Sequence, residues 1–248
     1  MSQKQNLNIG VLSIAGSAGK STFSRHGLAP LLPNSALISV EDWNAGDGRP
    51  DLEIGAKAFY SLAEQINIDD EQSFIVDIGT SNSKQMLQHF HDLELTRDRI
   101  DFWVVPVRAG AKERLDTLKT ISMLQAMGVD PKTIIVIGQA VTDVTQFDSE
   151  FGPLKDAARQ FGFFFAHQAV LFNEVFNMLK GGDQSVFDIV RDKPDFQALR
   201  REQKGDEKRL LELGNQMLVY SLCQTAARNL RSVFECTPMA TALSSEVV

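Results

Sequence analysis

The sequence predicts an α/β fold in which helices cover both faces of a mostly parallel sheet. Short apolar runs alternate with longer amphipathic segments from residue 8 to about residue 166. Continuous apolar strands are typical of parallel sheets, because helices bury both of their faces. A second observation is the small-residue loop Ala15–Gly19, which joins the first apolar run to a helical segment beginning with Lys20. A chain of 248 residues is long enough to bury one full core of this kind.

The order of the elements follows from these patterns. We expect strands at residues 9–14, 36–40, 73–78, 102–107, 133–139 and 162–166. We expect helices at residues 22–32, 51–66, 83–93, 112–127 and 148–160. Pro33 and Gly128 should end the first and fourth of these helices, since neither residue continues a helix readily. The spacing of Ile54, Leu62 and Ile66 indicates one buried face on the second helix.

The C-terminal part of the chain changes to a purely helical pattern. Residues 200–209 alternate both signs of charge, which is typical of a solvated helix face rather than a DNA contact. A long helical pattern then covers residues 210–234, and Pro238 should end it. We therefore predict a single domain, residues 1–248, with a core at about 8–185, a C-terminal helical extension at about 186–237 and a flexible tail at 238–248.

The loop after the first strand has the features of a phosphate-binding P-loop. Gly16 and Gly19 let the backbone curl so that its N–H groups face an anion, and the helix N-terminus adds partial positive charge. Lys20 can reach the β- and γ-phosphates, and the Ser21 hydroxyl is placed to bind Mg²⁺. The usual pattern G-x-x-x-x-G-K-[ST] would place a glycine at Ile14, and this chain has Gly16 instead. The residues expected to hold the nucleotide are Gly16, Ser17, Ala18, Gly19, Lys20, Ser21 and Thr22.

Other polar residues follow predicted strands. Asp77 ends an apolar strand, as in a Walker B motif, where the carboxylate lies near Mg²⁺ or its waters. Glu41 and Asp42 are alternative candidates for one task, which is to position the attacking water or to hold Mg²⁺ through water. Gln139 could read the adenine edge, because its amide both donates and accepts hydrogen bonds. Ligands of parallel sheets bind beyond the carboxyl ends of the strands, so these side chains should converge with Lys20.

These motifs resemble those of the ParA/MinD group of P-loop ATPases, also called the deviant Walker family. Ala15–Thr22 is similar to the family loop Lys-Gly-Gly-x-Gly-Lys-[Thr/Ser]-Thr, residues 41–50 look like its switch I, and Val76–Gly79 looks like its switch II. The resemblance covers about residues 8–180 and is closest to the StbB-type plasmid-stability proteins. It implies a switch that binds and hydrolyses ATP with Mg²⁺, forms a nucleotide-dependent homodimer, and acts with a DNA-binding partner in plasmid stability, partition or positioning.

One departure from the family pattern concerns Ala15, which stands where the family has its signature lysine. That lysine reaches across the dimer to the partner's phosphates, and a methyl group cannot supply its charge. If the family mechanism holds, another cation replaces it, or hydrolysis is slow, or nucleotide is bound with little turnover. Arg49 in the acidic loop is a candidate substitute, because arginine binds phosphate oxygens in a bidentate manner.

Two alternative functions are compatible with the same P-loop. One is a small-molecule kinase or ATP-dependent ligase, in which Arg97, Arg99 and Arg108 could form part of a lid over an acceptor. The other is a catalytically weak pseudo-ATPase adaptor, which Ala15 suggests.

Composition bounds the partners and the compartment. The net charge of −7 argues against a broad nucleic-acid-binding face, so a partner is expected to supply any DNA specificity. Cys223 and Cys236 lack metal-ligand spacing, which is typical of reduced thiols in a cytosolic protein. The sequence has no apolar core of a signal peptide and no membrane-spanning run, so we expect a cytoplasmic protein without a membrane partner.

Overall fold

The computed structural model describes residues 6–40, 52–53, 59–81 and 83–244. Its centre is a sheet of seven strands in the order β3-β2-β4-β1-β5-β6-β7, and every strand pair is parallel. The strands are β1 (Ile9–Leu12), β2 (Ser35–Val40), β3 (Leu52–Glu53), β4 (Ser73–Ile78), β5 (Phe102–Arg108), β6 (Ile134–Gln139) and β7 (Phe164–Phe165). Because β1 lies between β4 and β5, the loop that follows it opens at the middle of the sheet's carboxyl edge.

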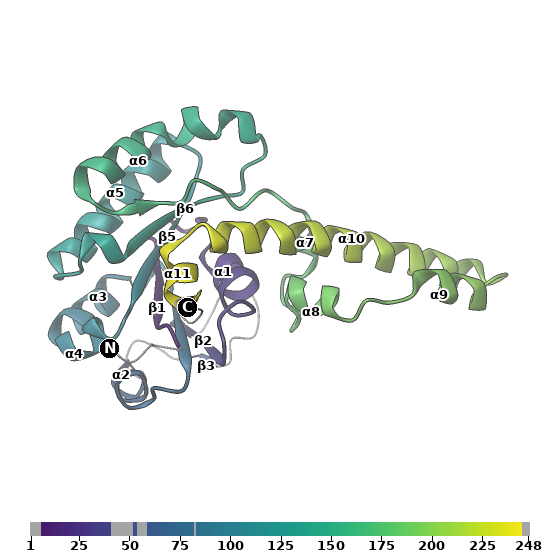
Figure 1. Ribbon diagram of the computed structural model, residues 1–248, viewed down its shortest axis with the longest axis horizontal. Helices are drawn as coiled ribbons and strands as arrows, with labels where there is room; N and C mark the ends of the chain where they lie inside the picture. The colour runs from purple at the N-terminus through teal and green to yellow at the C-terminus, as the bar shows by residue number, and fades with distance from the viewer. Residues whose placement is uncertain (1–5, 41–51, 54–58, 82, 245–248) are drawn as a thin grey trace.

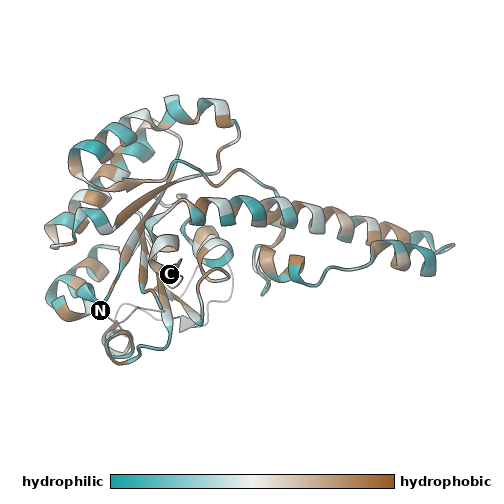
Figure 2. Ribbon diagram, viewed as in Figure 1, coloured by the Kyte–Doolittle hydropathy of each residue, from teal (hydrophilic) through white to brown (hydrophobic). Residues whose placement is uncertain are grey.

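Helices cover both faces of this sheet, so the predicted fold class is confirmed (Figure 1). One face is covered by α2 (Phe59–Ile68), α3 (Ser83–Asp92), α5 (Ala111–Ala126) and α6 (Phe147–Phe161). The other face is covered by α1 (Lys20–Phe23), the π-helical turn η1 (Ser24–Leu28), α7 (Val175–Met178), α8 (Val186–Arg191), α10 (Glu207–Glu235) and α11 (Pro238–Ser244). Apolar strands lie inside and the hydrophilic helix surfaces face outward (Figure 2). The strands are apolar on both faces because each face has a helical layer against it.

Close packing between β1 and β5 fixes the centre of the sheet. The indole of Trp103 lies over Gly10, where an added Cβ would come within 2.6 Å of the ring. The indole also meets the ring of Phe90 in a T-shaped arrangement, with a centroid separation of 5.1 Å. A side chain at Gly10 would therefore displace the largest buried residue of the core.

The first helix begins at Lys20, as the loop pattern indicates, but it does not continue as an α-helix to residue 32. It widens at Ser24 into the π-helical turn η1, in which the amide of Ala29 donates to the carbonyl of Ser24 at 2.9 Å. Gly27 in this turn lies so close to Phe23 and to Leu230 of α10 that a Cβ would come within 2.8 Å and 3.3 Å of them. The wider turn and the glycine together let α10 approach the P-loop helix. Such turns occur frequently at functional sites.

The predicted helix at residues 51–66 is wrong at Leu52–Glu53. These residues form the edge strand β3, in register with Ile38 and Ser39 of β2, and the described helix α2 is Phe59–Ile68. The open edge of β2 offers unpaired backbone groups, and pairing there satisfies them. The predicted helix at residues 83–93 ends at Asp92 and is followed by a separate short helix, α4 (Glu94–Asp98).

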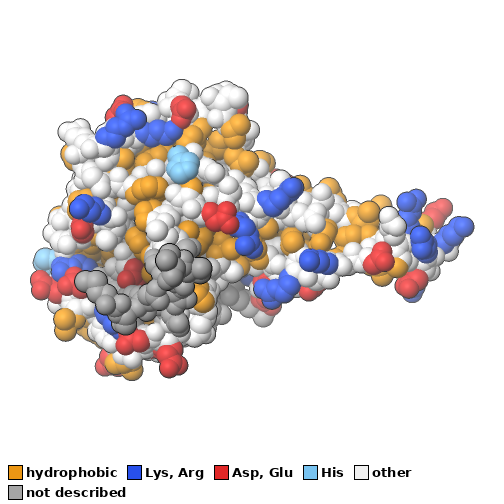
Figure 3. Space-filling model, viewed as in Figure 1, with side chains coloured by type: hydrophobic (Ala, Val, Ile, Leu, Met, Phe, Trp, Pro, Cys, Tyr) orange, Lys and Arg blue, Asp and Glu red, His pale blue; other side chains and the backbone are white. Residues whose placement is uncertain are grey.

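The C-terminal helix α10 has two halves with different surroundings. Its second half packs against the sheet and η1, with buried Ala226, Leu230 and Phe234 in the core. Its first half projects from the domain, and α9 (Phe196–Glu202) lies alongside its far end (Figure 1). On this projecting part, charged side chains of both signs lie among hydrophobic ones (Figure 3). The second half is thus a layer of the core rather than only an extension from it.

The predicted flexible tail at 238–248 is wrong for residues 238–244. Pro238–Ser244 forms the helix α11, and the Met239 side chain is completely buried against the α10 side of the sheet. The helix α10 ends at Glu235, and Pro238 follows it as the first residue of a new helix, a position where its fixed φ is favourable. In the described ranges, no helix combines the length and the apolar character needed to cross a bilayer.

Candidate functional site

A cavity of about 560 Å³ lies at the carboxyl edge of the sheet. Its lining comes from the loop after β1, the start of α1, the loop after β4, the ends of β5 and β6, and the segment 170–180. This volume is typical of pockets for small-molecule ligands and cofactors. The location agrees with the rule that ligands of parallel sheets bind beyond the carboxyl ends of the strands.

The loop after β1 is shaped by glycine. Gly19 has φ 84° and ψ 23°, a left-handed conformation that L side chains rarely adopt, and its carbonyl accepts the hydrogen bond from the Phe23 amide that starts α1. Gly16, Ser17 and Gly19 line the cavity, whereas Ala18 is buried and does not. Of the residues predicted to hold a nucleotide, Ala18 is therefore the one whose side chain faces away.

Lys20 turns back over this loop. Its side chain is 7% exposed, and its Nζ donates to the carbonyl of Ser13 at 3.4 Å and to Oγ1 of Thr80 at 2.9 Å. Thr80 follows β4, so the ammonium joins the loop after β1 to the loop after β4 at the wall of the cavity. Sequence reasoning did not single out Thr80; its signal was its place directly after Gly79 in the predicted switch II.

Ser21 and Asp77, the predicted Mg²⁺ ligands, lie on the same side of the sheet. Ser21 lines the cavity at the start of α1. Asp77 is 4% exposed on β4, beside Val11 of β1, and it does not line the cavity. A hydroxyl and a carboxylate are oxygen donors of the kind that Mg²⁺ binds together with phosphate oxygens and water. The residues present therefore fit a Mg²⁺-nucleotide complex.

Gln139 ends β6 and packs against the loop after β1. Its Oε1 would be 3.2 Å from a Cβ added to Gly19, so the amide lies directly against this loop. The side chain is 3% exposed, and its Nε2 donates no hydrogen bond to the described part of the chain. A buried donor without an acceptor costs about 1–3 kcal/mol, which a ligand that accepts from it would recover.

The segment 170–180 forms the far wall of the cavity, and sequence reasoning missed it because it has no periodic apolar pattern. Its backbone is held by β6 and the loop after it: the amide of Val170 donates to the carbonyl of Gly138, and that of Phe172 donates to Val141, each at 2.9 Å. Phe172 nevertheless keeps a side chain that is 52% exposed at the cavity. A fixed backbone carrying an exposed ring is suited to stack on a flat ligand.

The helix α10 also holds this segment. Asn229 accepts from the amide of Leu171 at 2.9 Å and donates to the carbonyl of Ala169 at 3.0 Å. Asn173 donates to the carbonyl of Leu222 at 3.2 Å. The far wall of the cavity and the C-terminal helix are thus joined by hydrogen bonds.

His26 lies in the π-helical turn and lines the cavity. Its side chain is 4% exposed, and its ring is tilted against that of Phe176 with a centroid separation of 5.5 Å. Burial and the neighbouring Arg25 charge lower the pKa of His26 to about 4, and the Asp188 carboxylate opposes this shift. The imidazole is therefore neutral at pH 7 and can act as an uncharged hydrogen-bonding group.

Among the described residues that line the cavity, all charged side chains are cationic. Its lining includes Lys20, Arg25, Arg108 and Lys180, and no Asp or Glu is among the described residues that line it. Several cations in one concave site create a positive electrostatic potential, which attracts an anion and raises its local concentration.

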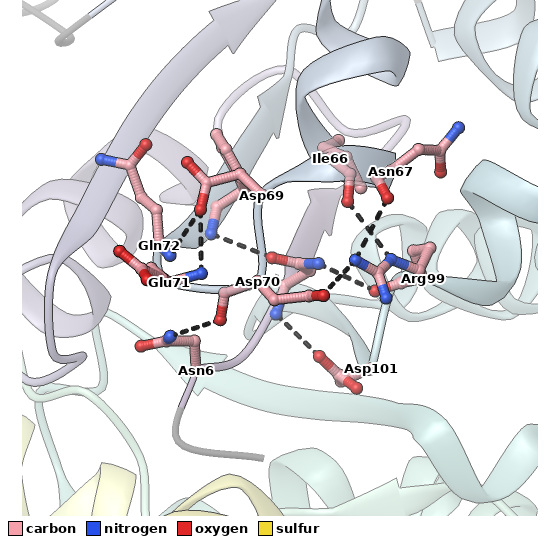
Figure 4. A network of polar contacts seen from close by, with 11 residues as sticks. Asn6, Ile66, Asn67, Asp69, Asp70, Glu71, Gln72, Arg99 and Asp101 are labelled. Atoms are coloured by element: carbon pink, nitrogen blue, oxygen red, sulfur yellow. Dashed lines mark hydrogen bonds and ion pairs between the residues drawn. The ribbon is translucent and has the colours of Figure 1, made fainter.

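Two of the arginines that were candidates for a lid over an acceptor lie elsewhere. Arg99 donates to the carbonyls of Ile66 and Asn67 and pairs with Asp70, in a network at the amino-terminal edge of the sheet (Figure 4). Arg97 donates to the carbonyl of Met127 at 2.7 Å. Only Arg108 of the three lines the cavity in the described structure. The prediction that all three could serve one lid is therefore wrong. The other candidates Glu41, Asp42 and Arg49 lie outside the described residues.

Comparison with known proteins agrees with this architecture. A variant of McdA from Cyanothece, in a complex with ATP, is similar with a TM-score of 0.54 and 14% sequence identity, covering 100% of this chain and 99% of that one. MinD from Aquifex aeolicus is similar with a TM-score of 0.51 and 15% identity, covering 91% of this chain and 97% of that one. The chain has the ParA/MinD-type fold.

A chain of the MinC:MinD complex from Aquifex aeolicus shares the ParA/MinD-type fold as well, with a TM-score of 0.50, 14% identity and coverage of 91% and 96%. No family model matches the sequence. No curated protein matches it either. The ParA/MinD-type fold thus rests on structure, and the function has to be argued from the cavity.

Proposed function

We propose that this protein is an ATP-dependent switch that binds Mg²⁺-ATP in the cavity and hydrolyses it. The observation that carries the proposal is the position of Lys20. A buried ammonium reaches from the P-loop to Thr80 at the wall of a cavity that contains no described acid. Hydrogen bonds from an ammonium group to phosphate oxygens are charge-assisted and strong, so a lysine in this position is suited to bind phosphate.

The remaining roles follow from position. The backbone of Gly16, Ser17 and Gly19 surrounds the phosphates, as oriented N–H groups in a glycine-rich loop do. Ser21 and Asp77 would hold Mg²⁺, which screens charge on the transferring phosphoryl group when it is bound. Glu41 or Asp42 orients the attacking water, a task in phosphoryl transfer that needs position more than basicity.

Gln139 is assigned to the base side of the nucleotide. Its amide lies against Gly19 and its Nε2 is buried without an acceptor in the described structure, so an adenine ring nitrogen can take that bond. Phe172 supplies an exposed ring on the same side of the cavity. The base therefore lies toward β6 and the segment 170–180, and the terminal phosphate lies toward Thr80.

We further propose that ATP drives homodimer formation and recruitment of a DNA-binding partner, in plasmid stability, partition or positioning. The motif resemblance to ParA/MinD proteins, including the StbB type, supports this role, and one structural neighbour is a complex of MinD with MinC. The net charge of −7 favours a partner over this chain as the source of DNA specificity.

Phosphate release in the presence of Mg²⁺-ATP tests the catalytic part. We expect slow release by the wild type that Lys20→Ala abolishes, because the variant loses the charge on the β- and γ-phosphates. Lys119→Ala is the control, since Lys119 is an exposed lysine on α5. Light scattering on the same samples measures the mass with and without ATP, and an ATP-independent mass would contradict the homodimer switch.

Two outcomes would favour the alternative functions. Tight binding without any phosphate release would indicate the pseudo-ATPase adaptor, which Ala15 already suggests. ATP consumption that rises only with a metabolite, without a protein partner, would indicate a small-molecule kinase or ligase. Arg97 and Arg99 give that second alternative no support, because neither lines the cavity and they bind Met127 and Asp70 instead.

A further inference from the structure

Arg108 stands at a central point of the carboxyl edge. It is the last residue of β5, which pairs with β1 on one side and with β6 on the other. In the register of the last pair, Arg108 lies directly beside Gln139. Arg108 therefore ends the strand that lies between β1, which leads into the P-loop, and β6, which carries the Gln139 amide proposed to bind the base.

The alternation of side chains along β5 places Arg108 on the α1 face. Val104 packs in the core cluster under α1 and α10, whereas Val105 and Val107 pack in the opposite cluster. Because strand residues alternate between faces, Arg108 shares the face of Val104. Gln139 is on the same face for the same reason, since Ile137 belongs to the cluster under α1. Arg108, at the end of β5, and Lys20, at the start of α1, thus both line the cavity.

The guanidinium of Arg108 has the properties of a ligand-binding group. Arg108 is exposed and lines the cavity, while Arg25, the other arginine there, donates to the carbonyl of Gly182. An arginine offers a planar pair of donors that matches phosphate oxygens. In a cavity without a described acid, this charge is available to an anionic ligand.

We propose that Arg108 is a second phosphate-binding cation of the site, supplied by the same chain, and that it contacts the α- and β-phosphates rather than the γ-phosphate. This inference rests on the proposed function. Lys20 and Thr80 mark the terminal-phosphate side, next to β4, and Gln139 marks the base side, on β6. Arg108 ends the strand between the P-loop and Gln139, so it meets the phosphates nearest the ribose.

Two consequences follow for the nucleotide site. Arg108 contributes affinity to ADP and ATP equally, because both carry α- and β-phosphates. It also supplies in one chain part of the charge that Ala15 does not supply. Because Arg108 belongs to the same chain as the P-loop, its contribution to nucleotide binding does not require a partner chain.

Calorimetric titration of ADP, ATP and pyrophosphate, each with Mg²⁺, into wild type, Arg108→Ala, Arg108→Lys and Arg159→Ala tests this assignment. We expect Arg108→Ala to weaken all three probes by about 10- to 100-fold, and by similar factors for ADP and ATP. Arg108→Lys should give an intermediate loss, since it keeps the charge and loses the paired donors. Arg159→Ala removes an exposed arginine of α6 and should change nothing.

Each of the other outcomes overturns the inference. Unchanged ADP affinity in Arg108→Ala would show that this arginine does not bind the phosphates. A loss confined to ATP would place it at the γ-phosphate instead. If Lys20→Ala abolishes ATP binding while Arg108→Ala has no effect, the proposed function stands and only this inference fails. If the wild type binds none of the three probes, both fail together.

Discussion

At the scale of single residues, the candidate site depends on a few polar side chains that line the cavity at the carboxyl edge of the sheet. Glycine, lysine and hydroxyl residues in a fixed order have few structural reasons to occur together, and the structure places Lys20, Ser21 and Gln139 around one cavity. Thr80 and Phe172 were not predicted, because a threonine or a phenylalanine in a loop carries no pattern of its own. Their significance depends on what the fold brings beside them.

Gln139→Met tests the base-side assignment at this scale. The methionine keeps the shape of the side chain and removes the buried Nε2, which has no acceptor in the described structure. We expect ATP affinity to fall by roughly 10-fold, pyrophosphate affinity to stay unchanged, and thermal stability to stay equal or rise. Titration calorimetry and thermal melts measure these quantities. An equal loss for pyrophosphate would assign Gln139 to the phosphates instead.

The lowered pKa of His26 predicts that the free energy of unfolding depends on pH. In the folded protein the pKa of His26 is about 4, whereas in the unfolded chain the imidazole has its ordinary pKa of 6.5. Between these values the unfolded state binds more protons, so the free energy of unfolding falls as the pH is lowered from 6.5 to 4. The fall due to His26 is at most about 3 kcal/mol.

Urea unfolding of wild type and His26→Gln at pH 7 and pH 5 isolates this contribution from that of other titrating groups. We expect the wild type to lose more stability on acidification than the variant does, since glutamine takes up no proton. Equal losses in the two proteins would show that His26 keeps an ordinary pKa in the folded state.

At the scale of elements, the strands were predicted more accurately than the helices. An apolar run bounded by polar residues identifies a buried strand, and β4 has the predicted ends. Helix ends depend on tertiary contacts that a sequence pattern does not contain. In the π-helical turn η1, for example, Gly27 packs against Leu230, a residue far away in the chain. The edge strand β3 exists because β2 offers it a partner.

Gly10→Ala tests the packing between β1 and β5. The added methyl group would meet the indole of Trp103, so we expect the free energy of unfolding to fall by about 1–3 kcal/mol. Gly152→Ala is the matched control, because Gly152 lies in α6 with open space around its Cβ position. Alanine favours a helix over glycine by about 0.5–1 kcal/mol, so this control should be stabilised. Equal effects of the two substitutions in urea unfolding would contradict the packing account.

At the scale of the whole molecule, the fold class followed from the alternation of strand and helix patterns alone. The arrangement of the C-terminal helices did not, because a helical pattern does not say which half of a long helix finds a partner. The sequence predicted an extension, and the structure shows that half of α10 covers the sheet and holds the far wall of the cavity through Asn229. The segment 170–180 lacks periodicity, so its place at the cavity depends entirely on this packing.

The central claim is that the cavity binds Mg²⁺-ATP through Lys20. Titration calorimetry of Mg²⁺-ATP into wild type, Lys20→Ala and Lys119→Ala tests it most directly. The account predicts saturable binding by the wild type and by Lys119→Ala, and its loss in Lys20→Ala when thermal melts show that variant to be folded. Normal binding by folded Lys20→Ala, or no binding by the wild type, would contradict the account.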